Sequence, residues 1–334
     1  MAVMRQSNFE LLRIVVMYMI LLLHANVLIF GRPQGNDLTF FFRMGAESMT
    51  IIAVNVFVLI TGYFGTSFRI SKIANLCFQI LFAVFPITLL LMAFKVVELH
   101  SIRDFTRGFR FWHYWFINAY IGLVLLSPIL NAAVKHLSRY QFKTILITLF
   151  IFFSFVHDSF FITPPGLHLI GGYSTMWFLF LYLLGRYVAV YSVDKSLSWN
   201  QVIFIYLIGL LGTFLCMWLL RLSTYNSPFI TIQALGFLLI FSKFSFSNKA
   251  VNFVASSSLM VFLLHRHPLL KEYYEGSIEY FNDVFGNTPQ FVVMTLGFCV
   301  VVFMISVLYD QLRKYAWSFL EPLVKKLDSK VASF

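Results

Sequence analysis

The sequence predicts an all-α integral membrane protein with about ten transmembrane helices and both termini in the cytoplasm. Of its 334 residues, 60% are hydrophobic and 12% are charged, and the mean hydropathy is +0.81. Soluble domains carry about 25% charged residues, so this chain cannot cover a water-facing surface in the usual way. Apolar runs of about 20 residues, enough to cross a bilayer, recur along the chain. Basic residues collect mainly in alternate connections between these runs.

The apolar runs define the predicted spans. They cover residues 8–30, 46–65, 74–96, 114–132, 143–162, 175–193, 200–220, 228–246, 251–267 and 290–311. No small-residue cleavage site follows the first run, which predicts an uncleaved first span. The run 251–267 is the weakest, because it contains several serines and ends in basic residues. The longest connections, 97–113 and 268–289, are too short to bury a core of their own, so residues 1–334 are predicted to form a single membrane domain.

Charge predicts the orientation, since an even number of spans places both termini on one side. With the N-terminus in the cytoplasm, that side receives Arg5, Arg69, Lys72, Lys135, Arg139, Lys143, Arg186, Lys195, Lys243, Lys249, Arg313, Lys314, Lys325, Lys326 and Lys330. The outer side receives Arg32, Arg43, Arg103, Arg107, Arg110, Arg221, Arg266 and Lys271. The excess on the first side favours cytoplasmic termini. It also explains the net charge of +11 without nucleic-acid binding.

The first span carries polar residues that need a reason, because a charge in hydrocarbon costs a few kcal/mol even on lenient scales. Arg13 and His24 are eleven positions apart, so they share one helical face and lie about 16 Å apart along the axis. Glu10 lies one turn before Arg13. The plain alternative is that Arg13 pairs with Glu10 and that His24 caps a backbone group. Three polar residues on one stripe favour a functional role.

Other candidates lie at the ends of later spans. Arg69 and Lys72 are one turn apart at the inner end of the second span, a spacing that suits a phosphate or pyrophosphate, although ordinary positive-inside charges have the same pattern. His265 and His267 lie at the outer end of the ninth span. Cys77, Cys216 and Cys299 show neither disulfide nor metal-ligand spacing, and no metal is expected.

The outer segment "SIRDFTRGFRFWHYWF" spaces arginines at helical intervals before a group of aromatic residues. Arg110, Trp112 and Trp115 are its candidates for contact with a sugar, since cations beside aromatic rings hold glycans at a membrane surface. An interfacial belt with snorkelling arginines explains the same pattern equally well. Together the polar residues predict a path across the membrane. Inner cations would hold a phosphorylated donor, and a histidine near the outer side would take a proton from an acceptor hydroxyl.

Five segments, in order along the chain, resemble those of the membrane-bound acyltransferase-3 family, and the third is most similar to its polysaccharide O-acetyltransferase branch. They are "NFELLRIVVMYMILLLHAN", "VNVFVLITGYF", "HYWFINAYIGLVLLSPILN", "GGYSTMWFLFLYLLGRYV" and "SSSLMVFLLHRHPLL". The resemblance covers essentially the whole chain. It implies transfer of an acetyl group from cytoplasmic acetyl-CoA to a sugar hydroxyl of a surface polysaccharide or its lipid-linked precursor, in the cytoplasmic membrane of a bacterium.

The resemblance also implies roles for residues. His24 would be the catalytic base or the acyl-handling group, and Arg13 would contact the donor within the membrane. Arg69 and Lys72 match the family's R-x-x-R pair, with a lysine that keeps the charge but lacks the bidentate fork. His265 corresponds to the family's later histidine, and His267 is the alternative. The remaining substrate contacts are the aromatic and basic residues of the outer segment already named.

Two further hypotheses stay open at this stage. A glycan transporter or flippase would also have many spans with buried charges, but it would be built from paired halves with broken helices, and no repeat is visible. A related enzyme would transfer another acyl group or modify another acceptor. The acyl group could pass directly from donor to acceptor or through a covalent acyl-enzyme, and the spacing of residues fits both routes. A monomer and a homo-oligomer are equally compatible with the sequence.

Overall fold

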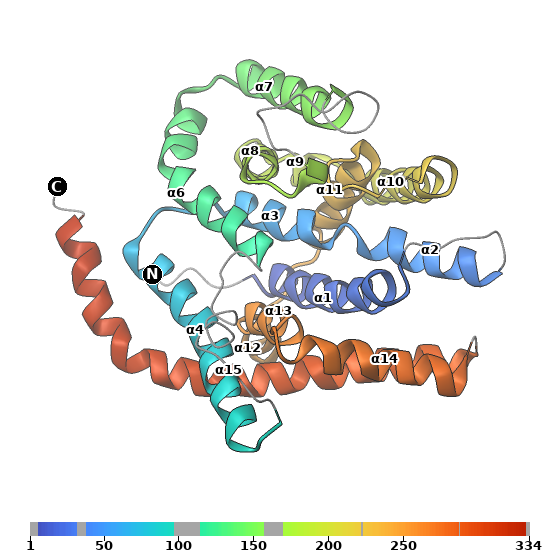
Figure 1. The fold of residues 1–334 in the computed structure, drawn as a ribbon. Helices are drawn as coiled ribbons and strands as arrows, with labels where there is room; N and C mark the ends of the chain where they lie inside the picture. Colours follow the sequence, from blue (N-terminus) through green and yellow to red (C-terminus); the bar gives the residue numbers. More distant parts are fainter. Residues whose placement is uncertain are drawn as a thin grey trace. The chain divides into compact units, whose positions relative to one another are not determined.

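The computed structural model describes residues 6–31, 38–96, 114–156, 170–221, 223–286 and 288–331 (Figure 1). Within these ranges the chain is helical and contains no β-strand. The packing divides it into two compact units. Unit 1 comprises Met1–Ser67 and Trp115–Ala255, and unit 2 comprises Phe68–Tyr114 and Ser256–Phe334.

The helices of unit 1 are α1 (Ser7–Leu23), η1 (His24–Leu28), α2 (Leu38–Thr50), α3 (Ala53–Phe64), α6 (Trp115–His136), α7 (Arg139–Ile151), η3 (Phe152–Val156), η4 (Ile170–Gly172), α8 (Thr175–Val190), α9 (Val193–Ser196), α10 (Trp199–Leu220), α11 (Pro228–Ser242) and α12 (Lys249–Ala255). Those of unit 2 are α4 (Ile70–Ala93), α13 (Ser258–His265), α14 (Lys271–Phe285) and α15 (Pro289–Val331).

Within the described ranges, 6 helices are long and apolar enough to cross a membrane. They are Ser7–Asn26, Thr39–Phe64, Ile70–Ala93, Trp115–His136, Trp199–Leu220 and Pro289–Asp328. Shorter apolar helices cover Thr175–Val190, Pro228–Ser242 and Lys249–His265. The remaining predicted span, 143–162, overlaps α7 and η3 and then leaves the described residues. The chain is therefore an all-helical, multi-pass membrane protein, as predicted, whereas the number of ten spans stays a prediction.

Helices α3 and α8 approach each other closely because each carries a glycine at the contact. A Cβ atom on Gly62 would meet the carbonyl oxygen of Tyr182, and one on Gly185 would meet that of Leu59. Small residues let two membrane helices bring their backbones together in this way. This contact holds the C-terminal end of α3 beside the C-terminal half of α8.

Several helix termini of unit 1 meet at what we call the basic end. Nη1 of Arg186, near the end of α8, donates to the carbonyl oxygen of Tyr63 at 3.2 Å. The Tyr63 hydroxyl donates to Oδ2 of Asp194 at 2.9 Å. Nζ of Lys243, at the end of α11, donates to the carbonyl oxygen of Asp194. The amide of Ser7, at the start of α1, donates to the segment that follows α11.

Rings and loop backbone gather at the opposite, aromatic end of unit 1. The ring of Trp115, at the start of α6, lies 4.4 Å from that of Tyr173 and 5.7 Å from that of Tyr225, between centroids. The amide of Tyr225 donates to the carbonyl oxygen of Gly171 at 2.9 Å. Nδ2 of Asn55, near the start of α3, donates to the Tyr225 carbonyl at 2.8 Å. These contacts join the starts of α3 and α6 to the connections that precede α8 and α11.

Helix α1 runs antiparallel to the pair α2–α3, from the basic end towards the aromatic end (Figure 1). The rings of Phe9 and Tyr63 stack with centroids 4.7 Å apart near one terminus. Near the other, Nε of Arg43 donates to Oδ1 of Asn26 at 2.9 Å. Within the predicted span 8–30, α1 ends at Leu23 and the helix continues as the π-helix η1.

Unit 2 is built around α15, which has 43 residues. The predicted span 290–311 lies within α15, which continues as a helix beyond residue 311. The charged residues beyond that point are compatible with a continuing helix, because Arg313 is 4% exposed and its Nε donates to Oδ1 of Asp310 at 2.8 Å. Its Nη1 also donates to Oδ1 of Asn75 on α4 at 3.1 Å. At 1.5 Å per residue α15 is about 65 Å long, twice the thickness of a hydrocarbon core.

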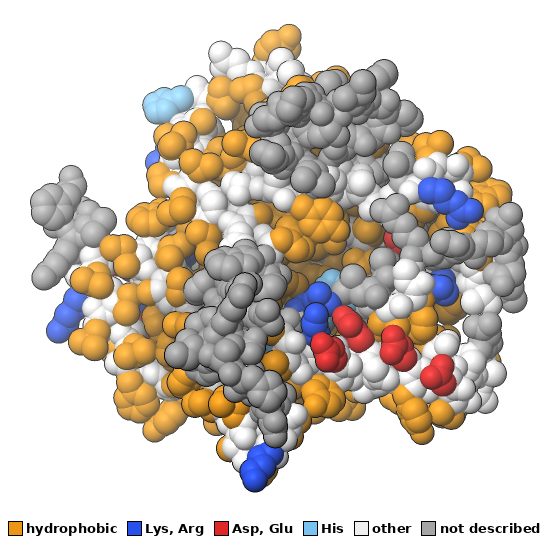
Figure 2. Space-filling view, viewed as in Figure 1, with side chains coloured by type: hydrophobic (Ala, Val, Ile, Leu, Met, Phe, Trp, Pro, Cys, Tyr) orange, Lys and Arg blue, Asp and Glu red, His pale blue; other side chains and the backbone are white. Residues whose placement is uncertain are grey.

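Two other boundaries of unit 2 differ from the predictions. The run 251–267 is interrupted by a turn at Ser256 and Ser257, between α12 and α13. Both hydroxyls accept hydrogen bonds from Nζ of Lys314. The predicted outer connection 268–289 contains helix α14. Its buried side is formed by Tyr274 and Ile278, while its other side carries a row of acids, Glu272, Glu275, Glu279 and Asp283 (Figure 2).

Candidate functional site

Arg13 lies on α1 within a polar cluster of unit 1. Its Nη1 donates to Oε1 of Glu10 at 2.6 Å, and the side chains are 32% and 9% exposed respectively. The guanidinium also lies over the ring of Phe64, 5.9 Å from its centroid. The hydroxyl of Tyr120 on α6 interacts with the charge of Arg13 and with the side chain of Thr61 on α3. Three helices therefore contribute to the surroundings of this one cation.

The pairing of Arg13 with Glu10 agrees with the plain alternative for these two residues. A cation with a carboxylate one turn away is partly compensated, which lowers the cost of keeping it between helices. About a third of the Arg13 side chain nevertheless remains accessible. Tyr120 was missed in the sequence because one more tyrosine in an aromatic-rich segment carries no distinguishing signal.

His24 is half-buried at the junction between α1 and η1. Its own backbone is α-helical, with φ −68° and ψ −36°, so the regular helix persists from Arg13 up to it. The shared face that the sequence predicts for Arg13 and His24 therefore holds, at different depths along α1. π-helical turns occur frequently at functional sites, and this one begins at the predicted catalytic histidine.

Near the far terminus of α1, α2 contributes two charged side chains. Arg43 is held by Asn26 and by the carbonyl oxygen of Gly31, at 2.9 Å to each. Glu47 is 3% exposed and interacts electrostatically with Arg43 one turn away. Glu47 was not among the residues predicted from the sequence, although a carboxylate just inside a predicted span is a usable signal.

Trp115 is the predicted sugar contact that the structure describes in unit 1. It stacks on Tyr225 with an interplanar angle of 29° and lies near Tyr173, whose side chain is 51% exposed. Burial raises the pKa of the Tyr225 phenol well above its usual value, so this hydroxyl is protonated at neutral pH. The arrangement offers an accessible ring with two others packed behind it. Two further predicted contacts, Arg110 and Trp112, lie outside the described residues.

Arg69 and Lys72 lie at the start of α4 in unit 2, and both are exposed. They are one turn apart, as predicted, with the amide of Lys72 donating to the carbonyl oxygen of Arg69 at 3.2 Å. An acid is also present: Oδ1 of Asp328, near the end of α15, accepts from the amide of Ser71 at 3.1 Å and interacts with the charge of Arg69. A phosphate at this helix terminus would compete with that carboxylate.

His265, another predicted substrate contact, lies in unit 2 and is 2% exposed. Its Nδ1 donates to the carbonyl oxygen of Val261 at 2.8 Å. The alternative residue, His267, is fully buried, and its Nδ1 accepts from the amide of Leu269 at 3.1 Å. Its Nε2 lies 3.5 Å from the carbonyl oxygen of Val84. Both ring nitrogens of His267 therefore face backbone groups, as in a histidine that positions a turn.

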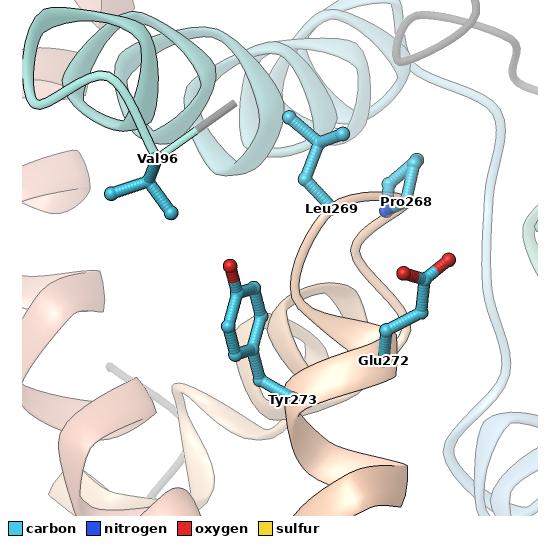
Figure 3. A pocket seen from close by; sticks show the side chains of 5 residues that line it. All are labelled: Val96, Pro268, Leu269, Glu272 and Tyr273. Atoms are coloured by element: carbon cyan, nitrogen blue, oxygen red, sulfur yellow. The ribbon is translucent and has the colours of Figure 1, made fainter. Parts of the chain in front are cut away.

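A cavity of about 460 Å³ opens beside this turn in unit 2 (Figure 3). Its lining residues are Val96, Pro268, Leu269, Glu272 and Tyr273. The Tyr273 hydroxyl points between the side chains of Val96 and Leu269, whereas the Glu272 carboxylate points away from them (Figure 3). The lining therefore combines three apolar side chains with one carboxylate and one hydroxyl.

The structure thus places Arg13, His24 and Trp115 in unit 1, and Arg69, Lys72 and His265 in unit 2. In unit 1 the first two share α1, and Trp115 belongs to the aromatic end. Among the described residues, no group of three or more histidine, cysteine, aspartate or glutamate side chains is arranged to hold a metal ion.

Comparison with known proteins and protein families identifies the family of this chain. A search of curated proteins and a search of solved structures found no significant match. A family model described as an acyltransferase domain, that of the acyltransferase-3 family, matches residues 6–308. This range covers most of unit 1, unit 2 as far as residue 308, and every described site residue discussed above except Asp328. The chain belongs to the membrane-bound acyltransferase-3 family.

Proposed function

We propose that this protein is an O-acetyltransferase of the bacterial cytoplasmic membrane. It transfers an acetyl group from cytoplasmic acetyl-CoA to a sugar hydroxyl of a surface polysaccharide or of its lipid-linked precursor. The observation that carries the proposal is the family match over residues 6–308, together with the Glu10–Arg13–His24 line on α1. An acyltransferase needs a base near its acceptor and a charge partner near its donor, and this line supplies one of each.

In the proposed reaction the acceptor oxygen attacks the carbonyl carbon of the thioester. His24 takes the proton of the hydroxyl as the carbon–oxygen bond forms. The carbon–sulfur bond then breaks, and the CoA thiolate leaves and receives the proton. Arg13 stabilises negative charge on the donor within the membrane. A covalent acyl-enzyme would instead divide the transfer into two steps, and a burst of CoA release before acceptor is added distinguishes that route.

Donor and acceptor approach from opposite sides in this proposal. Arg69 and Lys72 contact the phosphates of acetyl-CoA on the cytoplasmic side, and Lys72 does so as a point charge. Trp115, with Arg110, Trp112 and His265, contacts the glycan on the outer side. Ten spans with both termini in the cytoplasm provide this sidedness. Reporter fusions in the connections 133–142 and 221–227 test it, since they are expected to report opposite sides.

The test of the function is NMR of the host's surface polysaccharide with and without this gene. Loss of an acetyl methyl resonance, restored by a plasmid copy, is expected. Purified protein in lipid nanodiscs should then release CoA from acetyl-CoA only when the glycan is supplied. An unchanged polysaccharide spectrum in the deletion strain would exclude this acceptor. Glycan movement across the membrane without consumption of acetyl-CoA would show that the protein is a transporter and not an acetyltransferase.

A further inference from the structure

Arg186 has an unusual environment at the basic end of unit 1. Its Nη1 donates to the carbonyl oxygen of Tyr63, and this is its single hydrogen bond to the residues that the structure describes. Its Nε is buried and has no hydrogen-bond partner there. A buried N–H without a partner costs about 1–3 kcal/mol, so native proteins rarely leave one unsatisfied. A ligand or a water is therefore expected at this guanidinium.

The charge of Arg186 distinguishes these two occupants. No carboxylate of the described residues lies within ion-pair distance of it. The acid of this region, Asp194, is 5% exposed, and its carboxylate accepts instead from the Tyr63 hydroxyl. A half-buried guanidinium without a counter-ion favours an anion over a neutral water.

The loop beside the guanidinium is fixed in place. Gly65 has φ +75° and ψ 151°, a conformation that essentially only glycine adopts, and a Cβ atom there would lie 3.1 Å from Nη1 of Arg186. The amide of Thr66 donates to the Tyr182 hydroxyl at 3.1 Å, and Nδ2 of Asn131 donates to the Thr66 carbonyl at 2.7 Å. The Tyr182 hydroxyl in turn donates to Oδ1 of Asn131 at 2.6 Å.

These hydrogen bonds hold the loop of residues 65–67 next to Arg186. Tyr182 of α8 and Asn131 of α6 hold this short connection beside the guanidinium of Arg186. Ser67, the next residue, is exposed. The chain then continues into Arg69, two residues further along the sequence.

We propose that Arg186 and the loop of residues 65–67 form an anion-binding site for a phosphate or pyrophosphate group. The planar fork of the guanidinium suits two phosphate oxygens at once. This inference deepens the proposed function, on which the identity of the ligand rests: a nucleotide-containing thioester such as acetyl-CoA carries these groups. Arg186 then acts as a binding residue for the donor.

The test uses the full chain in lipid nanodiscs, with inorganic pyrophosphate and CoA as separate probes in equilibrium binding. Arg186→Gln should weaken pyrophosphate binding about tenfold or more. Arg139→Gln is the matched control, because it removes the same charge from an exposed residue of unit 1, at the start of α7, and should change binding less than about twofold. Arg186→Lys should give an intermediate loss, since it keeps the charge but lacks the fork.

A second variant addresses the possibility that Arg186→Gln does not fold. Gly65→Ala keeps every charge but forces its Cβ against the guanidinium, so it should also weaken pyrophosphate binding. Thermal unfolding with and without pyrophosphate gives an independent readout, because a bound ligand stabilises the native state. Wild-type pyrophosphate binding by folded Arg186→Gln or Arg186→Lys protein would overturn the site.

The two probes separate this inference from the function. Arg186-dependent binding of pyrophosphate and of CoA supports both. Arg186-dependent binding of pyrophosphate by a protein that does not bind CoA supports the anion site and contradicts the acetyl-CoA donor. CoA binding that is insensitive to Arg186→Gln contradicts the site and leaves the donor in place.

Discussion

At the basic end of unit 1, a buried guanidinium nitrogen has no hydrogen-bond partner among the described residues, whereas at the aromatic end Arg43 is held by Asn26 and Gly31 and the ring of Trp115 stacks on that of Tyr225. Arg186 and Lys243 donate to carbonyl oxygens, and the guanidinium of Arg186 keeps unused donors. At the aromatic end, the cations Arg43 and Arg221 lie over phenylalanine rings, 5.1 Å from the centroids. One end has spare hydrogen-bond donors for an anion, and the other has an accessible aromatic surface for a neutral ligand.

The difference indicates how a single helix can serve two ligands. α1 begins at the basic end, carries Arg13 one turn beyond the buried Glu10, and leads into His24, the first residue of η1, towards the aromatic end. A donor that enters from the basic side and an acceptor that arrives from the aromatic side would meet along this helix. Variants of residues at each end should therefore affect different kinetic parameters.

The largest expected effect is that of His24→Ala. Loss of a general base lowers kcat about 100-fold or more, because proton transfer then depends on water. Acetyl transfer by purified protein and the acetyl resonance of the host polysaccharide measure it. His136→Ala, at the exposed end of α6, is the control and should be active. Normal acetylation by a correctly inserted His24→Ala protein would remove the catalytic role.

The next effect concerns Arg13 and Glu10. Arg13→Gln leaves the Glu10 carboxylate, 9% exposed, without its cation, which should destabilise the protein by about 2 kcal/mol. The double variant Glu10→Gln/Arg13→Gln should recover most of that stability but not the activity, if Arg13 contacts the donor. Thermal unfolding and the donor KM separate the two roles. Full activity of the double variant would show that Glu10 and Arg13 form a purely structural ion pair.

A smaller effect is expected from Trp115→Ala at the aromatic end. Removing the ring that stacks on Tyr225 should raise the acceptor KM roughly 2- to 10-fold and leave the donor KM unchanged. Trp199→Ala is the matched control, since Trp199, the first residue of α10, packs on Phe244 instead. A change in donor KM instead would break the division between the two ends.

The smallest expected effect is that of a substitution beside the exposed cations of unit 2. Asp328→Asn removes the acid that interacts with Arg69, so the donor KM should fall about twofold at low salt, and less at high salt. Glu321→Gln, on the same helix and already paired with Lys325 at 2.8 Å, should have no effect. An unchanged donor KM in Asp328→Asn would argue against a phosphate at the start of α4.

The sequence by itself determined the class of the protein and the approximate position of the spans, because the hydrophobic requirement of a bilayer is local and acts on each run of about 20 residues. It also predicted the shared face of Arg13 and His24, which depends only on helical periodicity. The family resemblance, stated on five short segments, was confirmed by the match over residues 6–308.

Tertiary packing decided the rest. Beyond the predicted span 290–311, α15 continues with Arg313 bound by Asp310 and Asn75. The break between α12 and α13 depends on Lys314, which is 57 and 58 positions away from the two serines that it contacts. Arg186 looked like one more inner-side charge, and only its surroundings show that its buried Nε has no partner. Such partners come from distant parts of the chain, so no local sequence pattern predicts them.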